Sequence, residues 1–193
     1  MNESVKKKIA VLASGSGSNA ENIALYFSKH ADIEIALFIS NKKDAFVHER
    51  AKKLNIPCYY FSAKQFGETS DVVDFLKNEQ IDFIVLAGFL LKIPENILNT
   101  FSDSIINIHP ALLPKFGGKG MYGMHVHESV VASGETQSGI TIHYVNEKYD
   151  DGRIIFQATC EVLPDDTPEK VAEKVHALEY EHFPKVIESN LKI

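Results

Sequence analysis

Residues 8–19 read KIAVLASGSGSN, and this stretch decides the fold. Its first half, Lys8–Ala13, is a short apolar run typical of a buried strand, and its second half contains only small and polar residues. A helical pattern follows, with Ile23, Leu25 and Tyr26 available for a buried face. A strand, a glycine-rich turn and a helix in this order predict the first unit of a doubly wound α/β fold.

Strand and helix patterns keep alternating through the first half of the chain. Apolar strands are predicted at Ile33–Ser40, Pro57–Phe61 and Phe83–Ala87, and helices at Ala45–Leu54 and Val72–Asn78. Continuous apolar strands between helices indicate a parallel sheet that is covered on both faces. In such sheets the binding crevice lies at the carboxyl ends of the strands.

The second half has a different pattern, with a long loop and strands joined by a turn. In chain order we expect the strand Ser104–His109, the loop Pro110–Gly123, the helix His127–Ser133, the strands Gly139–Val145 and Arg153–Val162, and a last helix beginning near Asp166. We therefore expect a mostly parallel sheet with one or more late antiparallel strands. No repeat, low-complexity segment or linker divides the chain, so residues 1–193 are predicted to form a single domain.

Composition narrows the class of protein. The chain has 193 residues, 45% of them apolar, and 26 acidic against 20 basic residues give a formal net charge of -6. A nucleic-acid partner is disfavoured, because such partners usually need a broad basic face. No apolar run approaches the roughly 20 residues of a membrane span, and the polar first residues lack the apolar core of a signal peptide. We therefore expect a cytoplasmic protein with no membrane partner.

The glycine-rich turn Gly15–Ala20 favours anion binding. Glycines let the backbone approach an anion, and the start of a helix offers free N–H groups and a positive dipole end. A tight turn that needs glycine only for its geometry is the alternative. The string also fits the loose GxGxxA dinucleotide pattern, but Ser40–Lys43 lacks the acid that would bind a ribose. A single phosphate therefore fits better than NAD.

A second motif, Asn107-Ile108-His109-Pro110, closes a predicted strand. Strand alternation places Asn107 and His109 on one face, where an amide and an imidazole can hold a carbonyl oxygen. The alternative is a hydrogen-bonded core pair, and the loop that follows at once favours function. By contrast, the spacing of Asp150-Asp151-Gly152 alone indicates ordinary turn chemistry.

Metal binding is disfavoured. The pair His125 and His127 could bind zinc, with His109 or His143 as a partner, but no further ligand has diagnostic spacing. The two cysteines lie far apart in the sequence and lack a CxxC spacing. Loop histidines near an anion site are the better interpretation.

Taken together, the motifs resemble the phosphoribosylglycinamide formyltransferase family. The residues that carry the resemblance are Ser14–Asn19, Leu86–Phe89, Asn107–Pro114, Gly139–Val145 and Tyr149–Gly152, in the family's order. They span nearly the whole chain. The resemblance implies a formyltransferase-like fold with a phosphate-binding amino-terminal half and a catalytic, folate-binding carboxyl-terminal half.

The resemblance also implies roles for individual residues. The family's catalytic amide, imidazole and carboxylate match Asn107, His109 and Asp150. A supporting histidine of the family, on the strand before the turn that holds Asp150, matches His143. The positions that match the substrate-phosphate segment are Gly17, Ser18 and Asn19. Those that match the folate pocket are Leu90, Leu91, Lys92, Ile93 and Asn107, with Lys64 as a loosely aligned basic residue.

The sequence departs from the family's pattern in a loop and at the residue after Asp150. The loop segment Lys115–Gly123 is longer and richer in glycine than the family's usual form. Asp151 falls where the family usually has a small residue. We expect Asp150 rather than Asp151 to face the cleft, because adjacent residues of an extended chain point to opposite sides.

The implied activity is transfer of the formyl group of 10-formyltetrahydrofolate to the amine of 5-phosphoribosylglycinamide, in purine biosynthesis and without a metal. The alternatives are hydrolysis of the same formyl donor, and a non-catalytic phosphate-binding module that would not need Asn107, His109 and Asp150. The expected partners are these small molecules, and an edge strand or a helix stripe could serve a homodimer.

Overall fold

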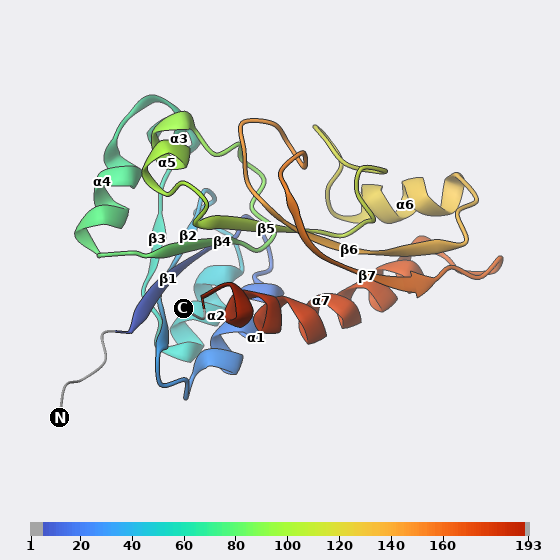
Figure 1. The fold of residues 1–193 in the computed structure, drawn as a ribbon, viewed down its shortest axis with the longest axis horizontal. Coiled ribbons are helices and arrows are strands. Elements are labelled where there is room, and N and C mark those ends of the chain that lie inside the picture. The colour runs from blue at the N-terminus through green and yellow to red at the C-terminus, as the bar shows by residue number, and fades with distance from the viewer. Residues whose placement is uncertain (1–5, 192–193) are drawn as a thin grey trace.

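A computed structural model describes residues 6–191 and shows one mixed sheet with helices on both faces (Figure 1). The strands are β1 (Lys7–Leu12), β2 (Ile33–Ser40), β3 (Cys58–Tyr60), β4 (Phe83–Leu86), β5 (Ile105–His109), β6 (Gln137–Tyr144) and β7 (Ile154–Glu161). The helices are α1 (Ser18–Phe27), α2 (Val47–Leu54), α3 (Ala63–Glu68), α4 (Asp71–Asn78), α5 (Glu95–Thr100), α6 (Met124–Ala132) and α7 (Pro168–Leu191).

The strand order is β3-β2-β1-β4-β5-β6-β7. Strands β1 to β5 pair in parallel, whereas β6 runs antiparallel to both β5 and β7. This confirms the predicted doubly wound, mostly parallel sheet with late antiparallel strands. The chain winds one way from β1 to β3 and the other way from β4 onward. The edge beyond β1 and β4 is therefore a topological switch point, where such folds bind ligands.

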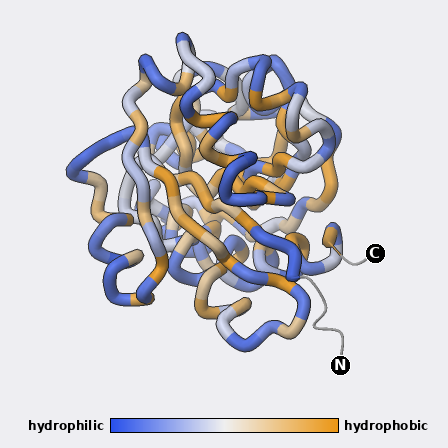
Figure 2. Tube along the Cα trace, turned by 90° about the vertical axis from the view of Figure 1, so that its left-hand side faces the viewer, coloured by the Kyte–Doolittle hydropathy of each residue, from blue (hydrophilic) through white to orange (hydrophobic). Residues whose placement is uncertain are grey.

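Two apolar layers hold the helices against the sheet. Ile9 and Val11 of β1 pack with α1, α2 and α7 on one face, while Ala10 and Leu12 pack with α3, α4 and α5 on the other. Both faces of the strand are buried, which is why its sequence is a continuous apolar run rather than an alternating one. Figure 2 shows the hydrophobic segments gathered in the interior and hydrophilic segments mostly around the outside.

The sequence reading missed two short helices, α3 and α5. Helix α3 is capped by Ser62, whose side chain accepts the Gln65 N–H while the Gln65 side chain accepts the Ser62 N–H. This capping box stabilises a helix of 6 residues that is too short to show an apolar period. Helix α6 begins at Met124, three residues before the predicted His127 start, because Gly123 with φ 58° ends the loop there.

None of the helices among residues 6–191 is long and apolar enough to cross a membrane.

Candidate active site

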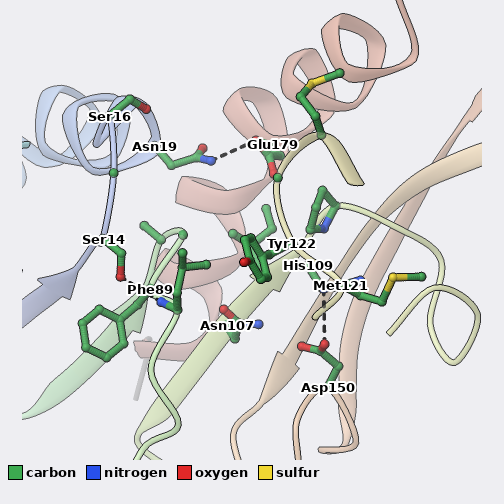
Figure 3. A pocket seen from close by; sticks show the side chains of 18 of the residues that line it. Ser14, Ser16, Asn19, Phe89, Asn107, His109, Met121, Tyr122, Asp150 and Glu179 are labelled. Atoms are coloured by element: carbon green, nitrogen blue, oxygen red, sulfur yellow. Dashed lines mark hydrogen bonds and ion pairs between the residues drawn. The ribbon is translucent and has the colours of Figure 1, made fainter. Parts of the chain in front are cut away.

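A cleft of about 730 Å³ opens at the carboxyl ends of β1, β4 and β5 (Figure 3). One wall is the glycine-rich turn between β1 and α1, and the opposite wall holds Asn107, His109 and Asp150. The loop after β5 and helices α6 and α7 complete the lining. The predicted phosphate segment and the predicted catalytic cluster therefore face one shared space.

Gly17 adopts φ 72°, the left-handed conformation that favours glycine. A Cβ at this position would lie 2.6 Å from Val47 Cγ2 and 2.9 Å from Val47 Cα. Since the second of these atoms is backbone, α2 would have to move to admit any side chain. Glycine is thus required here both for its backbone angle and for the close packing of α1 against α2.

The first turn of α1 points into the cleft without a side-chain cap. The first N–H groups of a helix have no partner within the helix, so Gly17, Ser18 and Asn19 offer backbone donors to an anion. The side chain of Asn19 is held from behind, since its Nδ2 donates to Glu179 Oε2 at 2.9 Å. Its buried Oδ1 has no hydrogen-bond partner among the described residues.

Ser14 connects this turn to the strand that precedes the predicted folate strip. Its hydroxyl donates to Asn41 Oδ1 at 2.6 Å and accepts the Leu90 N–H at 2.8 Å. The Ser14 N–H donates to the Gly88 carbonyl at 2.9 Å. These bonds fix the ends of β1 and β4 relative to each other at the switch point.

Asn107 is oriented by His143 on the neighbouring strand β6. The Nδ1 atom of His143 lies 2.8 Å from the Tyr144 carbonyl oxygen and therefore carries a hydrogen. In the neutral imidazole Nε2 is then an acceptor, and it lies 3.1 Å from Asn107 Nδ2. One N–H of the Asn107 amide is held in this bond, and the other remains to donate into the cleft.

His109 and Asp150 form the second part of the cluster. His109 Nε2 donates to the Phe116 carbonyl at 2.7 Å, and its Nδ1 lies 3.5 Å from Asp150 Oδ2. That same oxygen accepts the Gly118 N–H at 2.9 Å, while Asp150 Oδ1 lies 3.7 Å from His143 Nε2. The carboxylate thus faces both imidazoles, and Asp150 lines the cleft.

Asp150 faces the cleft and Asp151 points to solvent, but the expected reason was wrong. Asp150 has φ 54° and sits in a left-handed turn, so the alternation of an extended chain does not apply. The turn directs the Asp150 side chain inward, where it is 12% exposed, whereas the Asp151 side chain is 55% exposed beside Lys148.

Burial and charge move the pKa values of both His109 and Asp150. Burial lowers the pKa of His109, and this effect outweighs the opposite effects of Asp150 and of the Phe116 carbonyl. Burial raises the pKa of Asp150, but contacts with His143, His109 and the Gly118 N–H together outweigh it, so this pKa is lowered. The resting pair is therefore an ionised carboxylate beside a predominantly neutral imidazole at neutral pH.

The predicted folate residues divide between two spaces. Leu90 lines the main cleft, while Leu91, Lys92 and Ile93 line a smaller pocket of about 60 Å³ behind Asn107 and Asp150. Lys64 lies exposed on α3 and lines neither space.

The two histidines of the pair on α6 lie in different surroundings. His127 lines the cleft and is buried, whereas the His125 side chain is 63% exposed and pairs with Glu128. Within residues 6–191 no group of three His, Cys, Asp or Glu side chains is arranged to hold a metal ion.

Sequence reasoning missed the part of the cleft that α7 provides. Glu179 is 4% exposed, and its Oε2 accepts hydrogen bonds from Asn19 and from His176 Nδ1, the latter at 2.6 Å. The signal was present, because Glu179 follows Val175 by four residues and so continues the buried stripe of that helix. A carboxylate on an apolar stripe indicates a buried polar site.

These features define the class: a doubly wound α/β protein with a cleft in which the start of a helix lies opposite an amide, an imidazole and a carboxylate, groups suited to acyl transfer. Comparison with known sequences agrees with this class. The profile of the formyl transferase family matches residues 7–187, and the chain belongs to this family.

Relatives with assigned names are similar over most of this chain. The chloroplastic phosphoribosylglycinamide formyltransferase of Arabidopsis thaliana is 43% identical over 189 residues, which cover 94% of this chain and 64% of that protein. The phosphoribosylglycinamide formyltransferase of Bacillus subtilis (strain 168) is 36% identical over 190 residues, which cover 96% of this chain and 95% of that protein. The chain spans less than two thirds of the two plant relatives that it matches, at 64% and 61% of their lengths.

Solved structures of proteins with this name have a similar fold over most of this chain. The crystal structure of phosphoribosylglycinamide formyltransferase from Streptococcus pneumoniae TIGR4 matches with a TM-score of 0.85 at 36% identity, covering 96% of this chain and 99% of that one.

Proposed function

We propose that this chain transfers the formyl group of 10-formyltetrahydrofolate to the amine of 5-phosphoribosylglycinamide, a step of purine biosynthesis. One observation carries the proposal: Asn107, His109 and Asp150 come from separate segments and converge opposite the glycine-rich turn across a single cleft. The chain belongs to the formyl transferase family, and the relatives above bear the name of this activity.

The amine substrate would bind with its phosphate at the start of α1. There Gly17, Ser18 and Asn19 supply backbone N–H donors and the helix supplies its positive dipole end. Lys42 also lines the cleft and adds positive charge on that side. The ribose would follow toward Glu179, whose buried carboxylate can accept hydrogen bonds from hydroxyl groups.

The formyl donor would enter from the opposite side. Leu90, Leu91, Lys92 and Ile93 form a continuous strip after β4 that leads from the cleft into the smaller pocket beside Asn107. Such a strip offers an apolar surface for an aromatic ring together with backbone hydrogen bonds. Lys64 is not part of this proposal, because it lines neither space.

In the reaction the amine attacks the formyl carbon, and negative charge develops on the formyl oxygen. The free N–H of Asn107 donates to that oxygen, and a donor of this kind typically lowers the barrier by about 3–4 kcal/mol. The new C–N bond forms first and gives a tetrahedral intermediate, which collapses when the bond from the formyl carbon to N10 of the folate breaks and the carbonyl re-forms. Protein groups polarise the carbonyl, so the proposed route does not need a metal.

Proton transfer is assigned to His109 and Asp150. The Nε2–H of His109 is held by Phe116, so Nδ1 is the atom that gains or loses a proton, and it faces the carboxylate. Asp150 takes up the proton that leaves the attacking amine, directly or through one water molecule. The proton is then returned to N10 of the departing tetrahydrofolate, which restores the starting state.

The test is an assay of the purified protein with both substrates, following the folate product by absorbance and the formylated amine by mass spectrometry. We expect both products in equal amounts. A matched reaction without the amine measures hydrolysis. Folate product that forms equally fast without the amine, together with free formate, would identify a hydrolase, and no turnover by folded protein would favour a binding module.

A further inference from the structure

The backbone of residues 116–118 contacts both members of the His109–Asp150 pair. The Phe116 carbonyl accepts the His109 Nε2–H at 2.7 Å, and the Gly118 N–H donates to Asp150 Oδ2 at 2.9 Å. One short loop segment therefore holds the imidazole from one side and the carboxylate from the other. No side chain of the segment is involved in either bond.

The conformation of this segment depends on its glycines. Phe116 and Gly118 both have positive φ, 55° and 95°, so the chain turns sharply on each side of Gly117. A Cβ at Gly117 would lie 2.4 Å from Leu113 Cδ2 and 3.3 Å from Asp150 Cβ. Leu113 is itself buried, so a side chain at 117 would require either the Leu113 side chain or the segment beside Asp150 to shift.

The same loop continues directly into the cleft. Residues 118–124 line it, and Figure 3 shows Met121 and Tyr122 among the lining side chains. Gly120 and Gly123 also have positive φ, which lets this part of the loop turn back over the cleft. A molecule bound in the cleft would contact the loop on one side of Gly118 while the loop contacts the catalytic pair on the other.

We propose that residues 116–118 are a backbone clamp, in which Gly117 is a positioning residue that sets the geometry and tautomer of the His109–Asp150 pair. The expected effect on turnover rests on the proposed function, whereas the expected geometry and tautomer of the pair do not. The clamp holds the hydrogen of neutral His109 on Nε2 and keeps Nδ1 toward Asp150. It also makes the pair sensitive to the position of the loop that lines the cleft.

The clamp affects protonation in a defined direction. The Phe116 carbonyl raises the pKa of His109, and the Gly118 N–H lowers the pKa of Asp150. Other titratable groups that act on this pair are His143 on β6, His127 on α6 and Glu179 on α7. Opening the clamp would leave those groups in place, lower the pKa of His109 further and raise that of Asp150.

The first test uses the wild-type protein and needs no turnover. Ring nitrogen-15 NMR, with the His109 signals assigned by comparison with His109→Asn, reports which nitrogen carries the hydrogen in neutral His109. We expect the Nε2–H tautomer. The Nδ1–H tautomer would overturn the clamp whether or not the protein transfers formyl groups.

The second test is Gly117→Ala, with Gly134→Ala as the matched control. Gly134 has φ 69°, and a Cβ there would meet no atom within 4 Å, so its variant suffers backbone strain far from the clamp. We expect Gly117→Ala to lower kcat by about 10- to 100-fold with a smaller change in KM, since misplacement by roughly 1 Å can cost 100-fold. We also expect the acid limb of its kcat profile to move to higher pH.

The control separates positioning from loss of stability. Gly134→Ala is expected to lower the Tm while keeping kcat and its pH profile. If Gly117→Ala behaves like this control, the clamp is wrong. If Gly117→Ala does not fold, the tautomer measurement on the wild-type protein decides the question. An inactive wild-type protein with the Nε2–H tautomer would refute the proposed function and leave the clamp standing.

Discussion

Replacing Asp150 by Asn tests the proposed chemistry most directly, because it removes one charge and changes little else. The side chain has two roles in the structure: its Oδ2 accepts the Gly118 N–H, and its charge faces the two imidazoles. In Asp150→Asn the amide oxygen can keep the bond to Gly118. The amide nitrogen would then take the place of Oδ1 opposite His143 Nε2, which already accepts from Asn107, so no hydrogen bond is gained there. We therefore expect the turn and the fold to persist.

The loss of turnover follows from two effects that add. The variant lacks the carboxylate that we propose takes up the proton of the attacking amine, and general-base catalysis typically contributes about 10²- to 10⁴-fold in rate. It also removes the negative charge that raises the pKa of His109, so the imidazole becomes harder to protonate. We expect kcat to fall by about 10²- to 10⁴-fold, while KM for the phosphorylated amine changes little because Gly17–Asn19 is untouched.

The assay combines steady-state kinetics with thermal unfolding of the same samples. Asp151→Asn is the matched control, since that side chain is exposed and lies outside the cleft lining. It should retain wild-type kcat. Near-wild-type turnover by Asp150→Asn would refute the assigned proton transfer, and a strong loss in Asp151→Asn instead would show that the catalytic carboxylate had been assigned one residue too early.

Three further predictions concern other parts of the cleft. Asn107→Ala removes the proposed oxyanion donor and should lower kcat by about 10²- to 10³-fold, measured by steady-state kinetics. Gly17→Ala should reduce the free energy of unfolding by about 2–5 kcal/mol in a denaturant titration, because left-handed strain and the clash with Val47 both act on it. Burial lowers the pKa values of His109 and His127 from 6.5, so the unfolded chain binds more protons than the folded one. Their contribution to stability is present above pH 6.5 and should be lost as pH falls below it. In His127→Gln the Tm should therefore decrease less steeply as the pH is lowered below 6.5.

The order of strands and helices could be predicted because each long element leaves a periodic trace. The apolar runs Lys8–Ala13 and Phe83–Ala87 correspond to β1 and β4, which are buried on both faces. Helix α3 could not be found in this way, since it has 6 residues and one buried side chain, Phe66. Its signal is local, in the capping box at Ser62, and a search for apolar periods does not detect it.

The candidate site could be predicted in part. Asn107 and His109 lie on one face of β5, and strand alternation is sufficient to place them together. The contribution of α7 depends on how a distant helix crosses the sheet, which local sequence does not specify. Glu179 approaches Asn19 across 160 positions of sequence. The cytoplasmic location and the homodimer stay predictions.

The long glycine-rich loop explains how one site can be both accessible and accurately built. For the proposed reaction the cleft must open to admit two substrates, yet the imidazole and the carboxylate must hold their geometry to within a fraction of an ångström. The strands alone cannot fix the distance between the imidazole and the carboxylate. His109 ends β5, whereas Asp150 lies in the turn after β6. The backbone of Phe116 and Gly118 contacts both residues, and a Cβ at Gly117 between them would lie 2.4 Å from Leu113 Cδ2. Glycine at position 117 thus allows the close approach of the chain to the His109–Asp150 pair, whereas the larger residues Lys119, Met121 and Tyr122 follow where the loop lines the cleft.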